Sequence, residues 1–223
     1  MLRLQRMKLL GEVAAEVVHE IRNPIAVLRG MLQVLKERSG AGDRECFDLM
    51  LDEVDRVNAM VGELLCLAGK GGQPIPSAGQ EPSDLNLLLR RIYPLLAAYA
   101  SAEGKRVLLI TEELPRLALN ENEMRQLILN LARNGLEAMG SDGTLTISTG
   151  CQPGEVVLAF ADQGGGIEPE MLARLGTPFL SAKGGGTGLG LAVCYRIAER
   201  HQARIVVKTS PGGTTFQVRF HVD

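Results

Sequence analysis

The spacing of apolar residues divides this chain into two parts. Over the first 68 residues, two interleaved series recur every seven positions, at Met7, Ala14, Ile21, Leu28 and Leu35 and at Leu10, Val17, Pro24 and Met31. This heptad pattern predicts a helix that packs along a narrow seam. A second apolar stripe follows, at Phe47, Met50, Val54, Val57, Val61, Leu64 and Ala68. We therefore predict a helical hairpin over residues 1–68.

Two helices alone bury too little apolar surface to be stable. We expect the hairpin to pair with a second copy as a four-helix bundle, which makes the protein a homodimer. Residues 39–43 contain two glycines that stop the first helix, and Asp43 can cap the second. Residues 69–82 are rich in Gly and Pro, so they predict a linker or a short edge strand between domains.

The pattern changes from residue 83 onward. Helical periodicity extends from Asp84 to about Ser101, from Asn122 to Met139 and from about Thr187 to His201. Strand-like segments cover residues 105–114, 116–120, 144–150, 155–162, 203–209 and 214–222. The predicted protein is thus multi-domain, with an all-α hairpin followed by an α+β sandwich over residues 83–223, in which helices cover one face of a mixed sheet.

Charge and hydropathy exclude several classes of partner. The net charge of −2 provides no basic surface for nucleic acid. No apolar run approaches the ~20 residues of a membrane helix, so we expect no membrane contact within this chain and a cytoplasmic location. The four cysteines form no C-x-x-C pair and are expected to be reduced. Because Met1 lies almost inside the first predicted helix, we expect an upstream sensor domain in the native chain, with a membrane anchor as one option.

His19 falls at heptad position f, on the outer face of the first helix. An exposed histidine alone indicates little, but its neighbours add chemistry. Glu20 can orient the imidazole and keep it basic enough to attack phosphorus. Asn23 lies four residues on, on the same face. Pro24 removes the helical hydrogen bond to the Glu20 carbonyl, which indicates a local deformability beside His19.

The stretch LLGEVAAEVVHEIRNPIAVLRG, residues 9–30, resembles the H-box of the histidine kinase dimerisation and phosphotransfer domain. The resemblance implies that His19 takes the γ-phosphoryl group of ATP on a ring nitrogen. It implies that Glu20 assists as a base or orienter, and that Asn23 positions a water when a phosphorylated partner is dephosphorylated.

Three further elements indicate a nucleotide site. Asn130, Asn134 and Glu137 share one polar face of a predicted helix. The run DQGGGI, at residues 162–167, follows a strand, so its acid can accept from an adenine amino group while its glycines allow close backbone approach. The run GGGTGLGL, at residues 184–191, opens a helix whose N–H groups suit phosphates. One glycine loop is weak evidence, but three such elements in this order are strong.

This order, ending in PGGTTF, resembles the ATP-binding (Bergerat) domain shared by gyrase, the Hsp90 chaperone, histidine kinases and the MutL repair protein. The resemblance implies that Asn134 coordinates Mg²⁺, that Asn130 contacts the metal or phosphates, and that Asp162 reads adenine. A mobile lid is implied from about residue 168 to 186. The other implied ATP contacts are Gly164, Gly166, Phe179, Lys183, Gly186, Thr187, Gly188, Leu189, Gly190 and Thr215.

One position separates a kinase from a hydrolase. ATPases that resemble this domain typically carry Glu four residues before the metal-binding Asn, as the base that activates water. Here that position is Asn130, which cannot act as a base. Water is therefore disfavoured as the nucleophile, and His19 is the expected acceptor. Two further departures are Gly135, where the family usually has Ala, and Glu137, where many relatives have Lys.

We interpret the chain as an ATP:protein-histidine phosphotransferase that passes the phosphoryl group to an aspartate of a response regulator receiver domain, with phosphatase activity as an option. The Glu137–Met139 ending resembles the nitrogen-regulation and sporulation-kinase subgroup. Three alternatives are an inactive scaffold, a plain ATPase and a coiled-coil dimeriser. The intact boxes disfavour the first, Asn130 disfavours the second, and residues 122–191 are unexplained by the third.

Overall fold

The computed structural model describes residues 25–37, 43–44, 47–48, 50–51, 54, 57, 81–180 and 188–222. The chain divides into two compact units, Met1–Gly71 and Gly72–Asp223. Each unit is considered separately below.

In the first unit, residues 25–37 are helical, as the heptad pattern predicts. Most of the apolar side chains of this helix are exposed in the single chain, including Leu28 at 53% and Met31 at 58%. The ammonium of Lys36 forms an ion pair with the carboxylate of Asp48. The described part of the hairpin therefore carries an apolar stripe that one chain does not cover.

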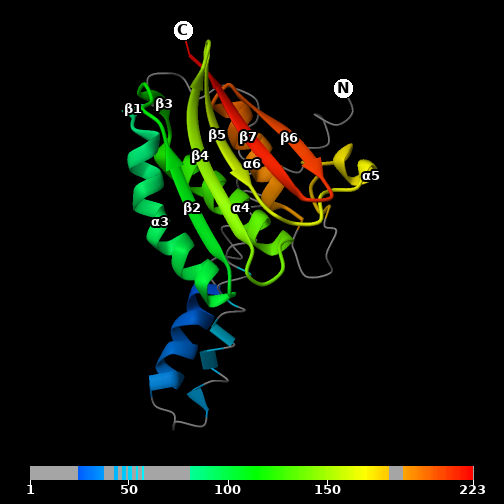
Figure 1. Ribbon diagram of the computed structural model, residues 1–223. Helices are drawn as coiled ribbons and strands as arrows, with labels where there is room; N and C mark the ends of the chain where they lie inside the picture. The colour runs from blue at the N-terminus through cyan, green and yellow to red at the C-terminus, as the bar shows by residue number, and fades with distance from the viewer. Residues whose placement is uncertain are drawn as a thin grey trace, which may run out of the picture. The chain divides into compact units, whose positions relative to one another are not determined.

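The second unit is a sheet with helices on one side (Figure 1). Its helices are α3 (Leu85–Ala102), α4 (Glu121–Ala138), α5 (Pro169–Leu172) and α6 (Gly190–Arg200). Its strands are β1 (Glu81–Ser83), β2 (Arg106–Thr111), β3 (Leu117–Leu119), β4 (Thr144–Gln152), β5 (Glu155–Ala161), β6 (Ala203–Ser210) and β7 (Gly213–His221).

The main sheet has the strand order β2-β4-β5-β7-β6, in which only the β2–β4 pair is parallel. Strands β1 and β3 form a separate antiparallel pair, so the chain just before α3 is a short strand, one of the two predictions for that segment. In Figure 1, α4 and α6 lie behind the main sheet and α3 lies along its β2 edge. The predicted mixed sheet with one helical face is confirmed.

Side-chain caps begin two of the helices. Oδ1 of Asp84 accepts from the Leu87 N–H over 3.0 Å and starts α3. Oδ1 of Asn120 accepts from the Glu123 N–H over 3.1 Å, so α4 begins one residue earlier than its periodicity predicts. Helix α6 begins at Gly190, about three residues later than predicted, because Gly188 has φ +66° and cannot belong to a right-handed helix.

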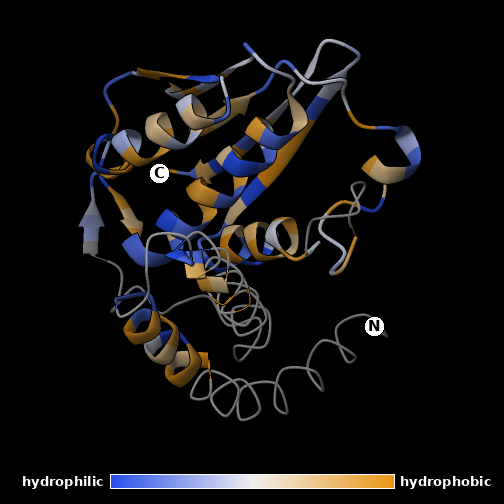
Figure 2. Cartoon of the chain, turned by 90° about the horizontal axis from the view of Figure 1, so that it is seen from below, coloured by the Kyte–Doolittle hydropathy of each residue, from blue (hydrophilic) through white to orange (hydrophobic). Residues whose placement is uncertain are grey.

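The core lies between the helices and the inner face of the sheet. Strand residues alternate, so Leu145, Ile147 and Phe160 are buried against fully buried α4 side chains such as Leu131. Figure 2 shows that individual helices and strands carry both hydrophobic residues, in orange, and hydrophilic residues, in blue. The opposite face is more open, and Ile110 of β2 is 49% exposed there. Every helix among the described residues is too short or too polar to cross a bilayer.

Candidate functional site

Asp162 follows the end of β5 and is buried, with 8% of its surface exposed. Its Oδ1 accepts from two backbone N–H groups, that of Gly164 at 2.8 Å and that of Thr214 at 3.1 Å. No described residue donates to its second oxygen, Oδ2. The two backbone donors hold the carboxylate in one orientation. One oxygen is thereby fixed to the protein, and the other is available to a donor on a ligand.

Close backbone packing explains the glycines around Asp162. Gly166 has φ +82°, and a Cβ there would lie 2.3 Å from the carbonyl oxygen of Ser210. A Cβ on Gly213 would lie 2.1 Å from the carbonyl oxygen of Asp162. Neither position tolerates a side chain. Gly165 has open space around it, so only the flanking glycines of the three-glycine run meet close neighbours.

Helix α4 passes directly beside Asp162. A Cβ built on Gly135 would lie 2.7 Å from Cδ1 of Leu145 and 3.5 Å from Cβ of Asp162. Glycine at this departure from the family pattern therefore leaves room for Leu145 and brings the helix close to Asp162. The neighbouring residue on α4 is Asn134. The structure thus brings the segment of α4 that carries Asn134 close to Asp162.

The side-chain amide of Asn134 makes no hydrogen bond with a described residue, and its Nδ2 is buried without a partner. A half-turn of the amide places Oδ1 there instead. An oxygen in that position fits a hard cation such as Mg²⁺, which takes few protein ligands and completes its shell with water and phosphate oxygens. Among the described residues no group of three His, Cys, Asp or Glu offers an alternative metal site.

Asn130 lies one turn before Asn134 on α4. Its Nδ2 donates to the carbonyl of Gly190 over 3.3 Å, and its Oδ1 accepts from Nε2 of Gln126 over 3.2 Å. In this arrangement Asn130 connects α4 to the first residue of α6. The side chain carries no group that could take a proton from water.

Gly188, just after the expected lid, lies against the backbone of Phe179, which is part of the expected lid. A Cβ on Gly188 would lie 2.6 Å from the backbone carbon of Phe179, whose side chain is 67% exposed and whose φ is +64°. Leu189 is buried, and Gly190 begins α6. Lys183, Gly186 and Thr187 lie outside the described residues, as do His19, Glu20 and Asn23.

Comparisons with known proteins decide the family. Residues 119–223 match the family described as histidine kinase-, DNA gyrase B- and HSP90-like ATPase, and residues 9–70 match the His kinase A (phospho-acceptor) domain. The chain belongs to the two-component histidine kinases.

Two curated relatives are similar to this chain along most of its length. Sporulation kinase C of Bacillus subtilis (strain 168) is 33% identical over 96% of this chain and 49% of its own length. Sensor histidine kinase ZraS of Escherichia coli (strain K12) is 34% identical over 97% of this chain and 46% of its own length. The chain thus spans about half the length of these relatives.

A solved structure supports the same fold. Full-length ShkA in complex with AMPPNP matches with a TM-score of 0.81 and 26% identity, over 94% of this chain and 45% of that one.

Two threonines of this chain lie in the candidate site without having been predicted. Thr214 is buried beside Asp162, whereas the predicted Thr215 points to the opposite face of β7 because successive strand residues alternate. Thr209 of β6 bonds to the turn after Asp162, with 2.8 Å between its Oγ1 and the Ile167 nitrogen. Strand alternation counted back from Phe216 could have favoured Thr214, but no local pattern reveals the contact of Thr209.

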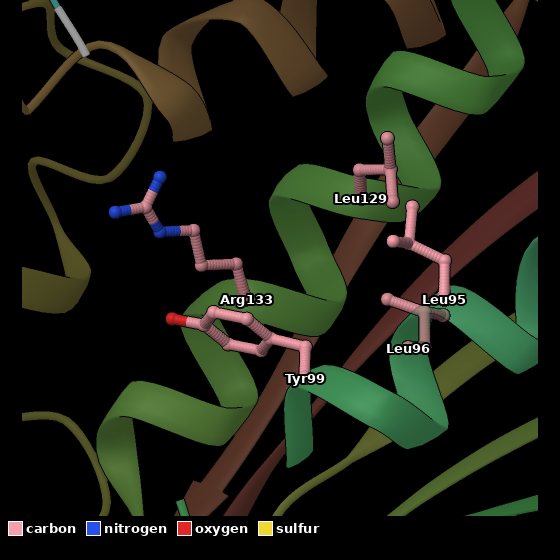
Figure 3. Close-up of a pocket in the computed structure, with 5 residues that line it drawn as sticks. All are labelled: Leu95, Leu96, Tyr99, Leu129 and Arg133. Atoms are coloured by element: carbon pink, nitrogen blue, oxygen red, sulfur yellow. The ribbon is translucent and has the colours of Figure 1, made fainter. Parts of the chain in front are cut away.

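A separate apolar pocket of about 180 Å³ lies between α3 and α4 (Figure 3). Leu95, Leu96 and Tyr99 of α3 line it together with Leu129 and Arg133 of α4, and none of these is a predicted nucleotide contact. Burial raises the pKa of the Tyr99 hydroxyl, and a hydrogen bond with Glu103 raises it further.

Arg133 also pairs with Glu137, with 2.7 Å between Nε and Oε1. The carboxylate that replaces the family's lysine is therefore engaged along its own helix.

Proposed function

We propose that this chain is an ATP:protein-L-histidine phosphotransferase. It autophosphorylates His19 from Mg-ATP and passes the phosphoryl group to an aspartate of a response regulator. The names of its relatives, which are sporulation and sensor histidine kinases, support this function. Asn23 adds a phosphatase activity toward the same regulator. Because ATP is the donor, the reaction takes place in the cytoplasm.

One observation carries the proposal: α4 passes close to Asp162 at Gly135, which has no side chain, and Asn134 is the adjacent residue of that helix. This closeness supports a single nucleotide site, with Asp162 as the acceptor for the base and Asn134 as the ligand for a phosphate-bound metal. Adenine presents an amino donor, and the unpaired Oδ2 of Asp162 is its acceptor. Guanine presents a carbonyl oxygen at the same position, which the carboxylate repels.

At the phosphate end, Asn134 provides the protein's ligand to Mg²⁺, and Asn130 contacts the metal or phosphates. When bound, Mg²⁺ neutralises the charge that develops on the transferred phosphoryl group. The backbone from Gly186 to Gly190 and the Lys183 ammonium surround the phosphates, and Phe179 belongs to the lid that covers them. The N–H groups at the start of α6 are donors of the kind that bind phosphates in other helices.

The acceptor is the His19 imidazole. Its unprotonated ring nitrogen donates an electron pair to the γ-phosphorus, the bond between that phosphorus and the β,γ-bridging oxygen breaks, and ADP leaves with the pair. The phosphorylated ring then releases its proton from the other nitrogen, and Glu20 orients the ring or accepts that proton. Water does not compete, because Asn130 cannot activate it.

The exposed apolar stripe of residues 25–37 supports a homodimer. Leu28 and Met31 belong to the two heptad series and are each more than half exposed in the single chain. A second copy covers them by forming a four-helix bundle. The receiver domain of the regulator docks on the outer surface of this bundle, where heptad position f places His19.

The experiment is incubation with γ-labelled ATP and Mg²⁺. We expect label on the protein that is labile in acid and stable in alkali, which is the behaviour of a phosphoramidate. His19→Gln should remove the label while retaining nucleotide binding, and Asn134→Ala should remove both. Label that persists in His19→Gln contradicts the acceptor assignment. Nucleotide binding without any label in the wild type favours a scaffold instead.

A further inference from the structure

Thr209 lies one residue before the end of β6, opposite Thr214 in the β6–β7 hairpin. The hydroxyl oxygens of the two threonines are 3.0 Å apart and hydrogen-bonded. Thr214 is buried, and its backbone N–H donates to Oδ1 of Asp162. Thr209 is therefore one hydrogen bond away from a residue that orients the Asp162 carboxylate.

The same hydroxyl holds the turn on the other side of Asp162. The Ile167 N–H donates to Oγ1 of Thr209 over 2.8 Å, across 42 positions of the sequence. Just before it, Gly166 presses its backbone on β6, where a Cβ would come within 2.3 Å of the Ser210 carbonyl oxygen and 3.2 Å of the Thr209 hydroxyl. The turn from Asp162 to Ile167 is thus seated against the last two residues of β6.

We propose that Thr209 is a positioning residue of the nucleotide pocket. Its hydroxyl contacts both segments that orient Asp162. One is the turn that follows Asp162 in the sequence, and the other is strand β7, where the Thr214 N–H donates to the Asp162 carboxylate. The inference deepens the proposed function, because it rests on Asp162 as the acceptor for adenine. Thr209 acts on the base through Asp162, and it takes no part in phosphoryl transfer.

A pair of substitutions separates the hydroxyl from the shape of the side chain. Thr209→Val keeps the branched shape but leaves the Ile167 N–H without its acceptor and Thr214 without its partner. Thr209→Ser keeps the hydroxyl. The matched control is Thr146→Val, because Thr146 is a half-buried threonine of β4 whose side chain makes no hydrogen bond with a described residue.

The measurement is the dissociation constant of Mg-AMPPNP by isothermal titration calorimetry, together with the KM for ATP and the kcat of autophosphorylation. We expect Thr209→Val to raise the dissociation constant and the KM about five- to tenfold, as the loss of one or two net hydrogen bonds implies. The kcat at saturating ATP should stay within about twofold, because the phosphate end is unchanged. Thr209→Ser and Thr146→Val should bind as the wild type does.

Equal affinity of Thr209→Val and the wild type overturns the inference and leaves the proposed function standing. The inference is also overturned if Thr209→Ser binds Mg-AMPPNP as weakly as Thr209→Val, or if Thr209→Val lowers the kcat and leaves the KM unchanged. A wild-type chain that binds no Mg-AMPPNP overturns both. If thermal melting shows that Thr209→Val is unfolded, Thr209→Ala, which removes the hydroxyl without placing a methyl group in its position, is measured with the same criteria.

Discussion

Two hydrogen bonds join Asp162 and Thr214. The Asp162 N–H donates to the Thr214 carbonyl over 2.9 Å, and the Thr214 N–H returns to Oδ1 of Asp162 over 3.1 Å. The first bond continues the β5–β7 ladder, and the second fixes the carboxylate. The acceptor proposed for adenine is therefore held by the sheet itself rather than by a loose loop.

Asp162→Asn should weaken nucleotide binding and leave the fold intact. Its amide oxygen can still accept from both N–H groups, but its NH₂ then faces the adenine amino donor. We expect Mg-AMPPNP affinity to fall about 10–100-fold, the loss of a charged hydrogen bond of about 1.5–3 kcal/mol. Calorimetry measures the affinity, and a thermal melt checks that the fold is kept. Unchanged affinity would show that Asp162 does not read the base.

Gly166→Ala should destabilise the second unit, because alanine at φ +82° is strained and its Cβ meets the Ser210 carbonyl. We expect a loss of about 2 kcal/mol or more in the free energy of unfolding, measured by urea denaturation. Gly165→Ala is the matched control. A Cβ there meets nothing within 4 Å, so its effect should be near zero. Equal effects of the two variants would mean that the turn does not press on β6.

Asn130→Glu should convert part of the kinase into an ATPase. A carboxylate at this position on α4 can accept a proton from water, and a positioned base accelerates such steps by about 10²–10⁴-fold. We expect release of free phosphate to rise at least about tenfold while phosphorylation of His19 falls. Asn130→Gln, which adds length without a base, should release no extra phosphate. If both variants hydrolyse ATP equally, the missing base is not what disfavours water.

Leu28→Glu should weaken the homodimer. Leu28 is 53% exposed in the single chain and belongs to the predicted seam, so a charge there must be buried in the bundle. We expect light scattering coupled to size-exclusion chromatography to show monomer at concentrations where the wild type is dimeric. Gln33→Glu, at an exposed polar position of the same helix, serves as the control and should remain dimeric. A monomeric wild type would contradict the bundle.

Local patterns predicted most of the second unit. Alternation located the strands of the main sheet, and helical periodicity located α3 and α4, because each signal arises within the segment that folds. The observed starts of α4 and α6 differ from the predicted ones because a single residue determines each start. Asn120 caps α4 through its side chain, and the positive φ of Gly188 delays α6. Neither effect belongs to the hydrophobic period.

The site residues that belong to a local sequence motif could be predicted. Those whose role depends on the register and facing of strands could not. The sequence motifs indicated Asp162, Asn134 and the glycines, and the structure brings Asp162 and the Asn134 segment together. The choice between Thr214 and Thr215 depends on which face of β7 each occupies. The bond from Ile167 to Thr209 joins segments 42 residues apart, and it appears only after the β6–β7 hairpin closes on the turn.

The central claim is that the γ-phosphoryl group moves from the site beside Asp162 to His19. Peptide mapping by mass spectrometry at neutral to alkaline pH, after incubation with Mg-ATP, tests it most directly. We predict one phosphorylated peptide that contains residue 19, with the phosphate on the imidazole, absent from Asn134→Ala. Phosphate on any other residue, or on the same histidine in Asn134→Ala, would contradict the account.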